Sequence, residues 1–586
     1  MIILGIHAYT HDSAAALIAD GHLVAAAEEE RFVGRKHTSR FPEQAIRYCL
    51  SEAGITLSDI DQVAIPWNPW VNLGTRGWFM VRNFPKCLLG LRAESSKEIL
   101  GSMALWGAIH AIPSKLRGLV DGQKAKFQTH FITHHDAHVA SAFFVSPFDK
   151  AAILTIDGAG EWDVATLGIG EGNRIRILRR DPFPHSLGMF YGAITQYLGF
   201  QEKEGEGKVM ALASFGEPSL RDNFKEFIRC NGAGEVSLNQ KYFRFQYDTK
   251  RQWYSPKLVK HLGPARKPED EMTEYYQNVA ATAQEILEDA GVVLAKTVHE
   301  MSGLPKLCLA GGVALNSVMN SRILNDSSSF EEMFIQPAAN DAGGALGAAL
   351  WVHHQMGGQR IPPMEHAFWG PSYTQEQVRD ALNGQGLQYV EPTRPLESIA
   401  CLIAEGAIVG WFQGRAEWGP RALGNRSILA DPRRKDMKDI LNSRVKFREG
   451  FRPFAPTILA ERVGEYFENS HESPFMLLVE KIRPEKNDEI PAVTHVDGTG
   501  RLQTVTRESN PKFYELIEAF DKLTGVPILL NTSFNVKGKP IVLTPEDAVD
   551  CFCSTGIDIL YAEGFVAWIE LQWGQKIMDK NESPVS

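Results

Sequence analysis

The chain has 586 residues, which is too long for one hydrophobic core and predicts two or three domains. Its formal net charge of -10 and its pI of about 6.0 argue against a dedicated nucleic-acid-binding protein. No segment approaches the ~18 consecutive apolar residues of a membrane helix, and the first residues lack the features of a secretion signal. The 7 cysteines are scattered, so we expect a cytoplasmic protein with reduced thiols and no membrane or nucleic-acid partner.

Residues 2–32 alternate strand-like apolar runs with turns. Asp20-Gly21 predicts a hairpin between two of these strands. His11 and Asp12 fall in the turn after the first strand, where short polar side chains commonly bond the turn itself. Two interpretations stay open: the pair contacts a ligand, or it only caps the turn.

Residues 66–130 have a different composition, in which tryptophans and phenylalanines alternate with arginines and lysines. We interpret this segment as a helical insertion with an aromatic face. Such a face could line an acceptor pocket, form the interface of a homodimer, or pack in the core.

Three histidines and an aspartate stand together in the segment HHDAHVASAFF. His134 and His138 are four residues apart in a stretch that favours a helix, so both imidazoles lie on one face. Neutral imidazoles at this spacing can hold a divalent metal ion between them. The alternative is that one histidine caps the helix and the others are surface or core residues.

Two predicted buried strands end in glycine turns. Residues 151–156 run into DGAG, and residues 306–310 run into GGVALN. Backbone N–H groups of such turns can face a phosphate, although a tight turn without any ligand fits each pattern as well. Lys208 lies in a predicted short helix after a Gly-rich charged segment, and Asp341 lies at a strand-to-helix switch. That aspartate points a carboxylate into a cleft or serves as an ordinary N-cap.

Residues 359–397 are rich in Pro and Gln and predict a linker and the start of a second domain. Beyond them, arginines stand beside Gly, Pro and Phe rather than in an amphipathic pattern. This placement indicates a cleft for phosphate or another oxyanion. The arginines are Arg415, Arg421, Arg426, Arg433, Arg434, Arg444, Arg448 and Arg452.

With these pieces, the chain resembles the O-carbamoyltransferases of the NodU/CmcH family. The motifs that carry the resemblance occur in family order from the first strand to about residue 542. Segments 66–130 and 217–268 carry no family motif, and acceptor choice could lie there. The motifs are IHAYTHDSAAALIADG, EEERFVGRKH, HHDAHVASAFF, DGAGEW, EGKVMALA, LAGGVALN, NDAGGALGAAL, WFQGRAEWGPRALGNRSIL, KFREGFRPFAP, HVDGTGRLQTV and LNTSFNVKGKPIV.

The resemblance implies an α/β protein with two domains. Residues 1–358 are expected to form an actin-like ATPase domain, similar to the threonylcarbamoyl transferase of tRNA modification. Residues 398–586 are expected to form a YrdC-like domain with a twisted sheet. In this second domain, carbamoyl phosphate and Mg²⁺-bound ATP would give carbamoyl-adenylate and pyrophosphate. The first domain would then pass the carbamoyl group to a hydroxyl of a small-molecule natural product and release AMP.

The resemblance also implies roles for single residues. His11 or Asp12 would take the proton of the acceptor hydroxyl or orient the acceptor, and Lys446 and Arg452 would act in catalysis. Fe(II) or another divalent ion would be held by His134, His138, Asp157 and Asp341. Carbamoyl phosphate would contact Lys446, Arg452, Arg501, Asn531 and Ser533, and ATP would contact Gln413, Arg415, Arg421 and Arg426. Carbamoyl-adenylate in the first domain would contact Gly158, Lys208, Gly311, Gly312 and Asn316.

Two other functions compete with this one. The chain could transfer a carbamoyl-type group to a macromolecule, either a tRNA or a protein cysteine. The acidic balance counts against RNA, and the paired Cys-x-x-Cys motifs of the protein-modifying relatives do not occur here. The chain could also be a nucleotide-binding module without catalysis, against which the complete set of metal-ligand candidates argues.

Overall fold

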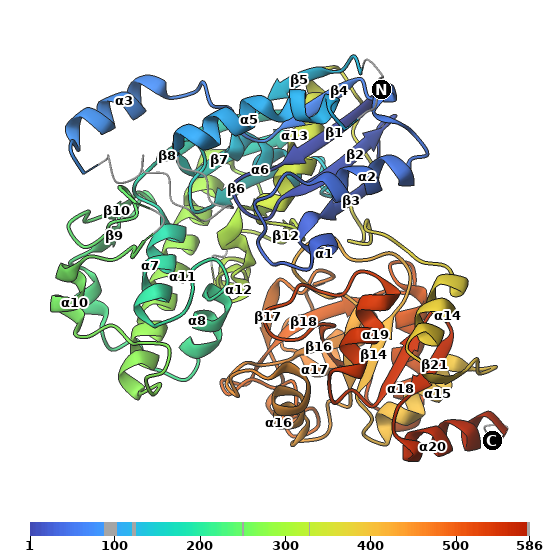
Figure 1. Cartoon of the computed structure of the whole chain (residues 1–586). Helices are drawn as coiled ribbons and strands as arrows, with labels where there is room; N and C mark the ends of the chain where they lie inside the picture. The colour runs from blue at the N-terminus through green and yellow to red at the C-terminus, as the bar shows by residue number, and fades with distance from the viewer. Residues whose placement is uncertain (87–101, 120–124, 249–250, 327–328, 583–586) are drawn as a thin grey trace. The chain divides into compact units, whose positions relative to one another are not determined.

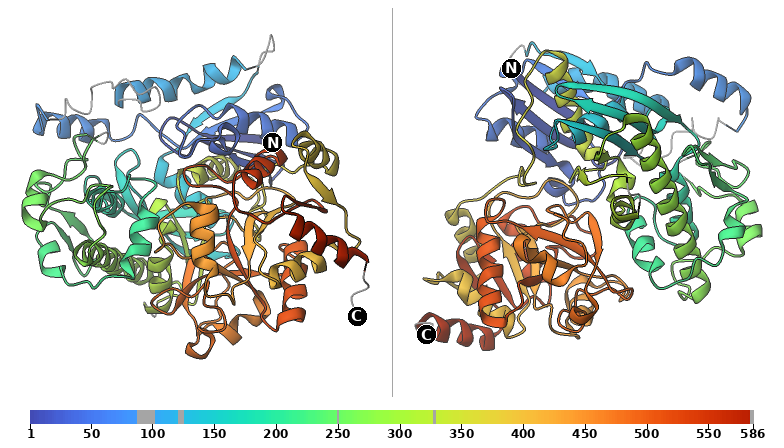
Figure 2. Two further views of the ribbon diagram at one scale, coloured as in Figure 1. Left: turned by 60° about the horizontal axis from the view of Figure 1, so that its bottom comes forward. Right: turned by 180° about the vertical axis from the view of Figure 1, so that it is seen from behind.

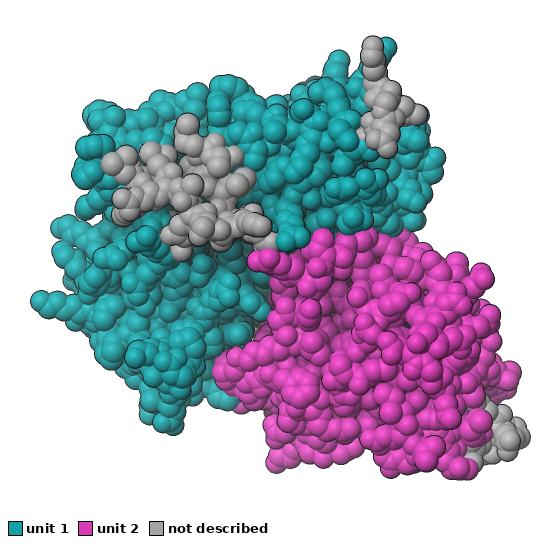
Figure 3. All heavy atoms as spheres, viewed as in Figure 1, with its two compact units in different colours: residues 1–29, 37–364 teal, residues 30–36, 365–586 magenta. Residues whose placement is uncertain are grey.

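The computed structural model describes residues 1–86, 102–119, 125–248, 251–326 and 329–582. The chain divides into two compact units. Unit 1 comprises Met1–Glu29 and His37–Met364, and unit 2 comprises Glu30–Lys36 and Glu365–Ser586 (Figure 3). Across the described ranges, none of the helices is both long enough and apolar enough to span a bilayer.

Unit 1 contains two five-stranded sheets with the same topology (Figure 1). In the first, β1, β2 and β3 form an antiparallel meander, and β4 and β5 continue from β1 in parallel. Asp20 and Gly21, both with positive φ, turn the chain between β2 and β3, which confirms the expected hairpin. The strands are β1 (Ile2–His7), β2 (Ala14–Ala19), β3 (His22–Glu28), β4 (Gln62–Ile65) and β5 (Gln128–Phe131).

The second sheet repeats this plan, with β6, β7 and β8 as the meander and β11 and β12 parallel to β6. Two copies of one mixed sheet in a single unit are the arrangement of the actin-like ATPase fold, so the expected α/β class is confirmed. The strands are β6 (Lys150–Ile156), β7 (Asp163–Glu171), β8 (Arg174–Pro182), β11 (Lys306–Ala310) and β12 (Glu332–Ile335).

Helices α6 and α13 pack against each other, and α13 also packs on β1. Glycines at these contacts make the close packing possible, Gly347 of the motif NDAGGALGAAL on α13 and Gly5 on β1. A Cβ atom at Gly347 would stand 1.8 Å from the carbonyl oxygen of Ala137, and one at Gly5 would stand 1.9 Å from that of Ala345. The other helices of unit 1 surround the two sheets. Those used below are α3 (Leu73–Arg82), α5 (Ser102–Arg117), α6 (His134–Phe143), α8 (Glu206–Ala213), α11 (Glu274–Ser302), α12 (Ser317–Asp326) and α13 (Asp341–Gln355).

The segment expected as a helical insertion contains α3 and α5. Trp70 and Trp106 meet edge to face with ring centroids 4.9 Å apart, so part of the aromatic side is packed within unit 1. Trp78 on α3 is 66% exposed. Residues 87–101 and 120–124 of this segment lie outside the described residues.

Unit 2 is built on a nine-stranded mixed sheet of order β13-β21-β20-β14-β15-β19-β16-β18-β17. Two helix pairs pack on it, α15 with α18 and α14 with α19 (Figures 1 and 2). The strands are β13 (Gln388–Val390), β14 (Val409–Phe412), β15 (Arg426–Ala430), β16 (Ala455–Leu459), β17 (Leu478–Lys481), β18 (Thr499–Val505), β19 (Ile528–Ser533), β20 (Ile559–Ala562) and β21 (Phe565–Trp568). The helices are α14 (Gln375–Gly384), α15 (Pro395–Ala404), α16 (Met437–Ile440), α17 (Val463–Tyr466), α18 (Pro511–Thr524), α19 (Pro545–Cys553) and α20 (Leu571–Glu582).

The boundary of unit 2 differs from a simple division along the chain. Helix α14 and strand β13 fold inside the range 359–397, where we expected a linker and the start of the second domain. Residues 30–36 also belong to unit 2. This range begins at the second residue of α1 (Glu29–Val33) and so contains most of that helix. The guanidinium of Arg31 donates a hydrogen bond to the carbonyl of Gly419, and this bond attaches residues 30–36 to unit 2.

Candidate functional site

The four residues expected to hold a metal ion come together in unit 1. His134 and His138 lie one turn apart on α6, Asp157 directly follows β6, and Asp341 is the first residue of α13. All four are buried, and each offers one ligand atom within 4.8 Å of the others. The carboxylate of Glu161 accepts the backbone N–H of His134 at 3.0 Å and so holds the start of α6 in place.

The spacing of these atoms fits a metal ion. His134 Nε2 lies 3.0 Å from His138 Nε2, 3.1 Å from Asp157 Oδ2 and 3.5 Å from Asp341 Oδ1. Ligand bonds of about 2.0–2.2 Å place neighbouring ligand atoms roughly 3–4 Å apart around one ion. Two imidazoles and two carboxylates form a mixed nitrogen and oxygen donor set suited to a divalent transition metal.

The charges of this group are balanced against burial. Burial disfavours the charged form of His134, but Asp341 and Asp157 outweigh it and raise its pKa to about 10. Burial and the neighbouring His134 lower the pKa of His138 to about 4. Without a metal ion, the group therefore keeps one imidazole charged beside two carboxylates, and a cation is the natural replacement for that proton.

Residues of the first turn in the chain surround this group. The Thr10 hydroxyl donates to Asp341 Oδ2 at 3.2 Å, and His7 Nε2 lies 3.4 Å from the same atom. His11 Nε2 lies 3.6 Å from it. His11 thus stands beside Asp341, one of the four expected ligands.

Asp12 has three hydrogen-bond partners. It lies 2.9 Å from His11 Nδ1 and 2.7 Å from His37 Nδ1, and it accepts from the Asn340 amide at 2.9 Å. Burial raises the pKa of Asp12, but His37 and His11 outweigh it and leave the pKa below its usual range. Asp12 therefore orients two imidazoles. We did not single out His37 from the sequence, although it ends the motif EEERFVGRKH.

The expected nucleotide contacts fall into two groups. Gly312 donates its N–H to Asp157 Oδ1 at 2.7 Å, and Gly311 has φ +92° with Ile156 so close that a Cβ would clash. A Cβ at Gly158 would make only an ordinary contact, 4.0 Å from the terminal methyl group of Met189. These three glycines thus gather at Asp157.

The other two expected residues have partners within the protein. The Asn316 amide exchanges hydrogen bonds with Gln284 of α11 at 2.9 and 3.0 Å. The ammonium of Lys208, on α8, lies 5.5 Å from the centre of the Phe200 ring.

In unit 2, several buried cations lie close enough to lower one another's pKa. Burial and the charge of Arg452 lower the pKa of Arg421 to about 10 and that of Arg448 to about 9. Burial, Arg421, Arg452 and Arg448 hold the pKa of Arg501 well below its usual value. We call Arg421, Lys446, Arg448, Arg452 and Arg501 the cation cluster. Their mutual repulsion would be relieved by a bound anion.

Lys446 connects the cation cluster to the end of β19. Its ammonium donates to the side-chain oxygen of Asn535 at 2.9 Å and to the carbonyl of Ser533. Burial and the charges of Arg448 and Arg452 hold its pKa well below the usual range. Asn531, two residues before Ser533 on the same strand, is 1% exposed.

The residues expected to grip ATP are not equivalent. Gln413 donates to Gly424, Asn425 and Asn510, and Arg415 donates to two backbone carbonyls. Arg426 is fully buried, stacks 3.7 Å from the centre of the Phe412 ring and donates to the carbonyl of Gln413. These three side chains hold the loop between β14 and β15, whereas Arg421 belongs to the cation cluster.

Two further residues organise this region, and neither was singled out from the sequence. Glu417 accepts the backbone N–H groups of Leu423, Asn425 and Arg426 on one oxygen at 2.9–3.0 Å. Its place within GRAEWGPR, an acid among arginines, is a signal that could have indicated it. Burial lowers the pKa of His495, which stands close to Arg501, to about 4 and keeps the imidazole neutral.

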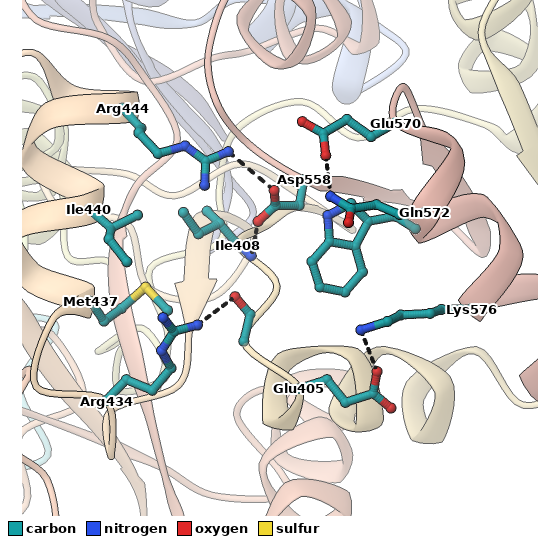
Figure 4. A pocket seen from close by; sticks show the side chains of 12 residues that line it. Glu405, Ile408, Arg434, Met437, Ile440, Arg444, Asp558, Glu570, Gln572 and Lys576 are labelled. Carbon is teal, nitrogen blue, oxygen red and sulfur yellow. Dashed lines mark hydrogen bonds and ion pairs between the residues drawn. The ribbon is translucent and has the colours of Figure 1, made fainter.

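Unit 2 also has a cavity of about 430 Å³ lined by residues of α16, α20 and neighbouring loops (Figure 4). Its charged walls neutralise each other: Arg444 pairs with Asp558 at 3.3 Å, and Lys576 pairs with Glu405 at 3.0 Å. Arg434 and Arg444, two of the arginines expected to form an oxyanion cleft, line this cavity, but none of the residues expected to bind a substrate or metal ion or to act in catalysis does. We therefore assign it no part in the reaction.

The fold and the sites define a two-domain enzyme with a metal-type His/Asp group in one unit and an anion site in the other. Residues 2–350 match the family model for the carbamoyltransferase N-terminus, and residues 400–568 match that for the carbamoyltransferase C-terminus. The chain belongs to the carbamoyltransferase family, and the resemblance seen in the sequence is confirmed.

The chain is similar to two curated proteins over nearly all of its length. It is 41% identical to an uncharacterized protein of Synechocystis, with 96% of each chain covered. It is 38% identical to the nodulation protein NolNO of Sinorhizobium fredii, over 95% of this chain and 79% of that one. A solved structure, component A of a 2-hydroxyglutaryl-CoA dehydratase from Acidaminococcus fermentans, is 14% identical with a TM-score of 0.30 and covers 60% of this chain and 97% of its own. That last likeness is too low to carry an argument.

Proposed function

We propose that this carbamoyltransferase is an ATP-dependent O-carbamoyltransferase that works in two half-reactions. In unit 2, carbamoyl phosphate and ATP give carbamoyl-adenylate and pyrophosphate. The adenylate keeps only the α-phosphate of ATP, so the phosphate of carbamoyl phosphate leaves as inorganic phosphate and one water is consumed. In unit 1, an acceptor hydroxyl attacks the carbamoyl carbon, the bond to AMP breaks, and the hydroxyl proton passes to a base.

The cation cluster supports the first half-reaction, and it is the single observation that carries the proposal. Lys446, Arg452 and Arg501 would neutralise carbamoyl phosphate, and Arg421 would contact the phosphates of Mg²⁺-bound ATP. Burial and repulsion among these cations mean that an anion relieves an electrostatic cost already present in the protein. The mixed nine-stranded sheet is compatible with a YrdC-like domain, which this proposal includes.

Unit 1 supports the transfer step. His134, His138, Asp157 and Asp341 would hold a divalent ion, Fe(II) or a similar one. When bound, such an ion supplies positive charge that stabilises a phosphate leaving group. The glycine turns at Gly158 and Gly311-Gly312 would approach the adenylate with their backbone.

The contacts of Asp12 support one choice of the residue that takes the proton. Asp12 already has three partners, so it is poorly placed to accept a proton itself. It lies beside Nδ1 of His11 and of His37, which fixes the tautomer that keeps Nε2 as an acceptor. We therefore assign the base to an imidazole that Asp12 orients, and Asp12 a positioning role.

Two substitutions separate the half-reactions. Lys446→Ala should abolish pyrophosphate release, because it removes a buried cation from the anion site. His138→Ala should leave pyrophosphate release largely intact and stop transfer of the carbamoyl group to the acceptor. Lys522→Ala and His130→Ala are matched controls. Lys522 pairs with Glu518 on the surface, and His130 on β5 lies within hydrogen-bonding distance of Gln62 on β4. Normal transfer by the His138 variant would contradict the role of the metal group.

The competing functions predict other results. A nucleotide-binding module would bind ATP yet release no pyrophosphate with carbamoyl phosphate under any condition. An enzyme that modifies a tRNA or a protein would complete the first half-reaction and then use that macromolecule, not a hydroxylated small molecule, as acceptor. Mass spectrometry of acceptors incubated with both co-substrates distinguishes the two, because each carbamoyl group adds one fixed mass.

A further inference from the structure

The side-chain amide of Asn531 has hydrogen-bond partners for its NH₂ group but, within the part of the chain that the structure describes, none for its carbonyl oxygen. Its Nδ2 donates to Gln503 Oε1 at 2.8 Å and to the carbonyl of Ala422 at 3.4 Å. Among the described residues, its buried Oδ1 has no hydrogen-bond partner. A buried acceptor left unpaired destabilises the protein, and a hydrogen-bond donor from a bound ligand would remove this cost.

Gln503 determines which atom of the Asn531 amide, the nitrogen or the oxygen, is left without a hydrogen-bond partner in the described ranges. The Thr457 hydroxyl donates to Gln503 Oε1 at 2.6 Å, and Gln503 Nε2 donates to the carbonyl of Leu423 at 2.9 Å. Turning the Gln503 amide over would bring its oxygen against the Leu423 carbonyl. Glu417 in turn holds the N–H of Leu423, so this carbonyl is fixed. The Asn531 amide must therefore present Nδ2 to Gln503 and its carbonyl oxygen elsewhere.

The unpaired oxygen belongs to the region of the cation cluster. Ala455 of β16 pairs with Asn531 of β19, and Thr457 pairs with Gln503 of β18. Arg501 precedes Gln503 by two residues and so lies on the same face of the sheet, with only the small Ala455 between it and Asn531. Ala422, whose carbonyl contacts the Asn531 amide, directly follows Arg421.

The resemblance already implies that Asn531 contacts carbamoyl phosphate. We propose that Gln503 is the positioning residue of this contact: it keeps Asn531 Oδ1 available to accept a hydrogen bond from the amino group of the ligand. The site would then select a carbamoyl phosphate over an acyl phosphate. Acetyl phosphate has the same phosphate and carbonyl but a methyl group in place of the amino group, which would leave Oδ1 buried and unpaired. This inference rests on the proposed use of carbamoyl phosphate.

Calorimetry on the full chain without ATP tests the inference with three ligands: carbamoyl phosphate, acetyl phosphate and inorganic phosphate. We expect the wild-type protein to bind carbamoyl phosphate at least about tenfold more tightly than acetyl phosphate, since one buried hydrogen bond separates them. Gln503→Met has a similar size but none of the three hydrogen bonds. It should weaken carbamoyl phosphate binding to the level of acetyl phosphate, while the affinity for inorganic phosphate changes by less than about twofold.

A purely structural role of Gln503 would instead weaken all three ligands together, and that result would overturn the inference. If Gln503→Met does not fold, Thr457→Val serves in its place, because it removes one donor to Gln503 and should reduce the same selectivity in part. Equal binding of carbamoyl and acetyl phosphate by the wild-type protein would refute the inference and leave the proposed function standing. Failure to bind any of the three ligands would refute the proposed anion site itself.

Discussion

Replacement of Arg501 by glutamine should weaken carbamoyl phosphate binding without destabilising the ligand-free protein. Arg501 is half-buried and faces three other arginines, and burial together with their charges lowers its pKa. In the empty protein its charge is therefore opposed by its neighbours. Removing it relieves repulsion, so we expect the free energy of unfolding of the ligand-free variant to stay the same or to rise.

The magnitude for the bound state follows from the loss of charged hydrogen bonds. Hydrogen bonds to a charged group contribute about 1.5–3 kcal/mol, which corresponds to roughly 10- to 150-fold in affinity. At a ligand concentration of about 100 times the wild-type Kd, the wild-type protein gains about 2.7 kcal/mol of stability. A variant with roughly 30-fold weaker binding would gain less than about 1 kcal/mol under the same condition.

Thermal denaturation with and without carbamoyl phosphate measures both quantities in one experiment. Arg434→Gln is the matched control, because Arg434 lies in the same unit but pairs with Asp436 outside the cation cluster. It should leave the protection by carbamoyl phosphate unchanged. Full protection of the Arg501 variant would refute the assignment of the cluster. A large loss of stability in its ligand-free form would refute the electrostatic reasoning.

Three further predictions follow from the sites. Carbamoyl phosphate affinity should fall as the pH rises through the lowered pKa of Lys446, because the ammonium then loses the proton that the anion needs. Lys446→Met should flatten this dependence, and a steep profile of the variant in calorimetry at several pH values would contradict the reasoning. Chelation or His138→Ala should lower the metal content measured by plasma emission spectrometry, whereas retention of one ion by the variant would contradict the assigned ligands. Glu417→Gln should lower the free energy of unfolding of unit 2 by about 1–3 kcal/mol in urea, since three backbone N–H groups lose their charged acceptor, and an unchanged midpoint would count against that role.

The sequence was sufficient to predict features that depend on local patterns. Strand endings at DGAG and GGVALN placed Asp157 and the glycines correctly, because a buried strand that breaks at glycine has few alternatives. The α/β fold class and the family also followed from motifs in order. These features depend on runs of consecutive residues, and sequence patterns predict local structure most reliably over such runs.

Features that depend on distant partners could not be predicted in the same way. Arg421 and Arg426 are five residues apart in one arginine-rich motif. Arg421 belongs to the cation cluster, whereas the guanidinium of Arg426 donates its hydrogen bonds to backbone carbonyls. Only the fold of the loop between β14 and β15 separates these outcomes. The return of residues 30–36 to unit 2 and the partnership of His37 with Asp12 likewise depend on contacts that no local pattern records.

The most direct test of the account is pyrophosphate release from ATP by the wild-type protein, with and without carbamoyl phosphate and with no acceptor present. The account predicts that release depends on carbamoyl phosphate and that inorganic phosphate appears in equal amount. Pyrophosphate release that is the same without carbamoyl phosphate, or that stays absent in the presence of both co-substrates and a broad set of hydroxylated acceptors, would contradict it.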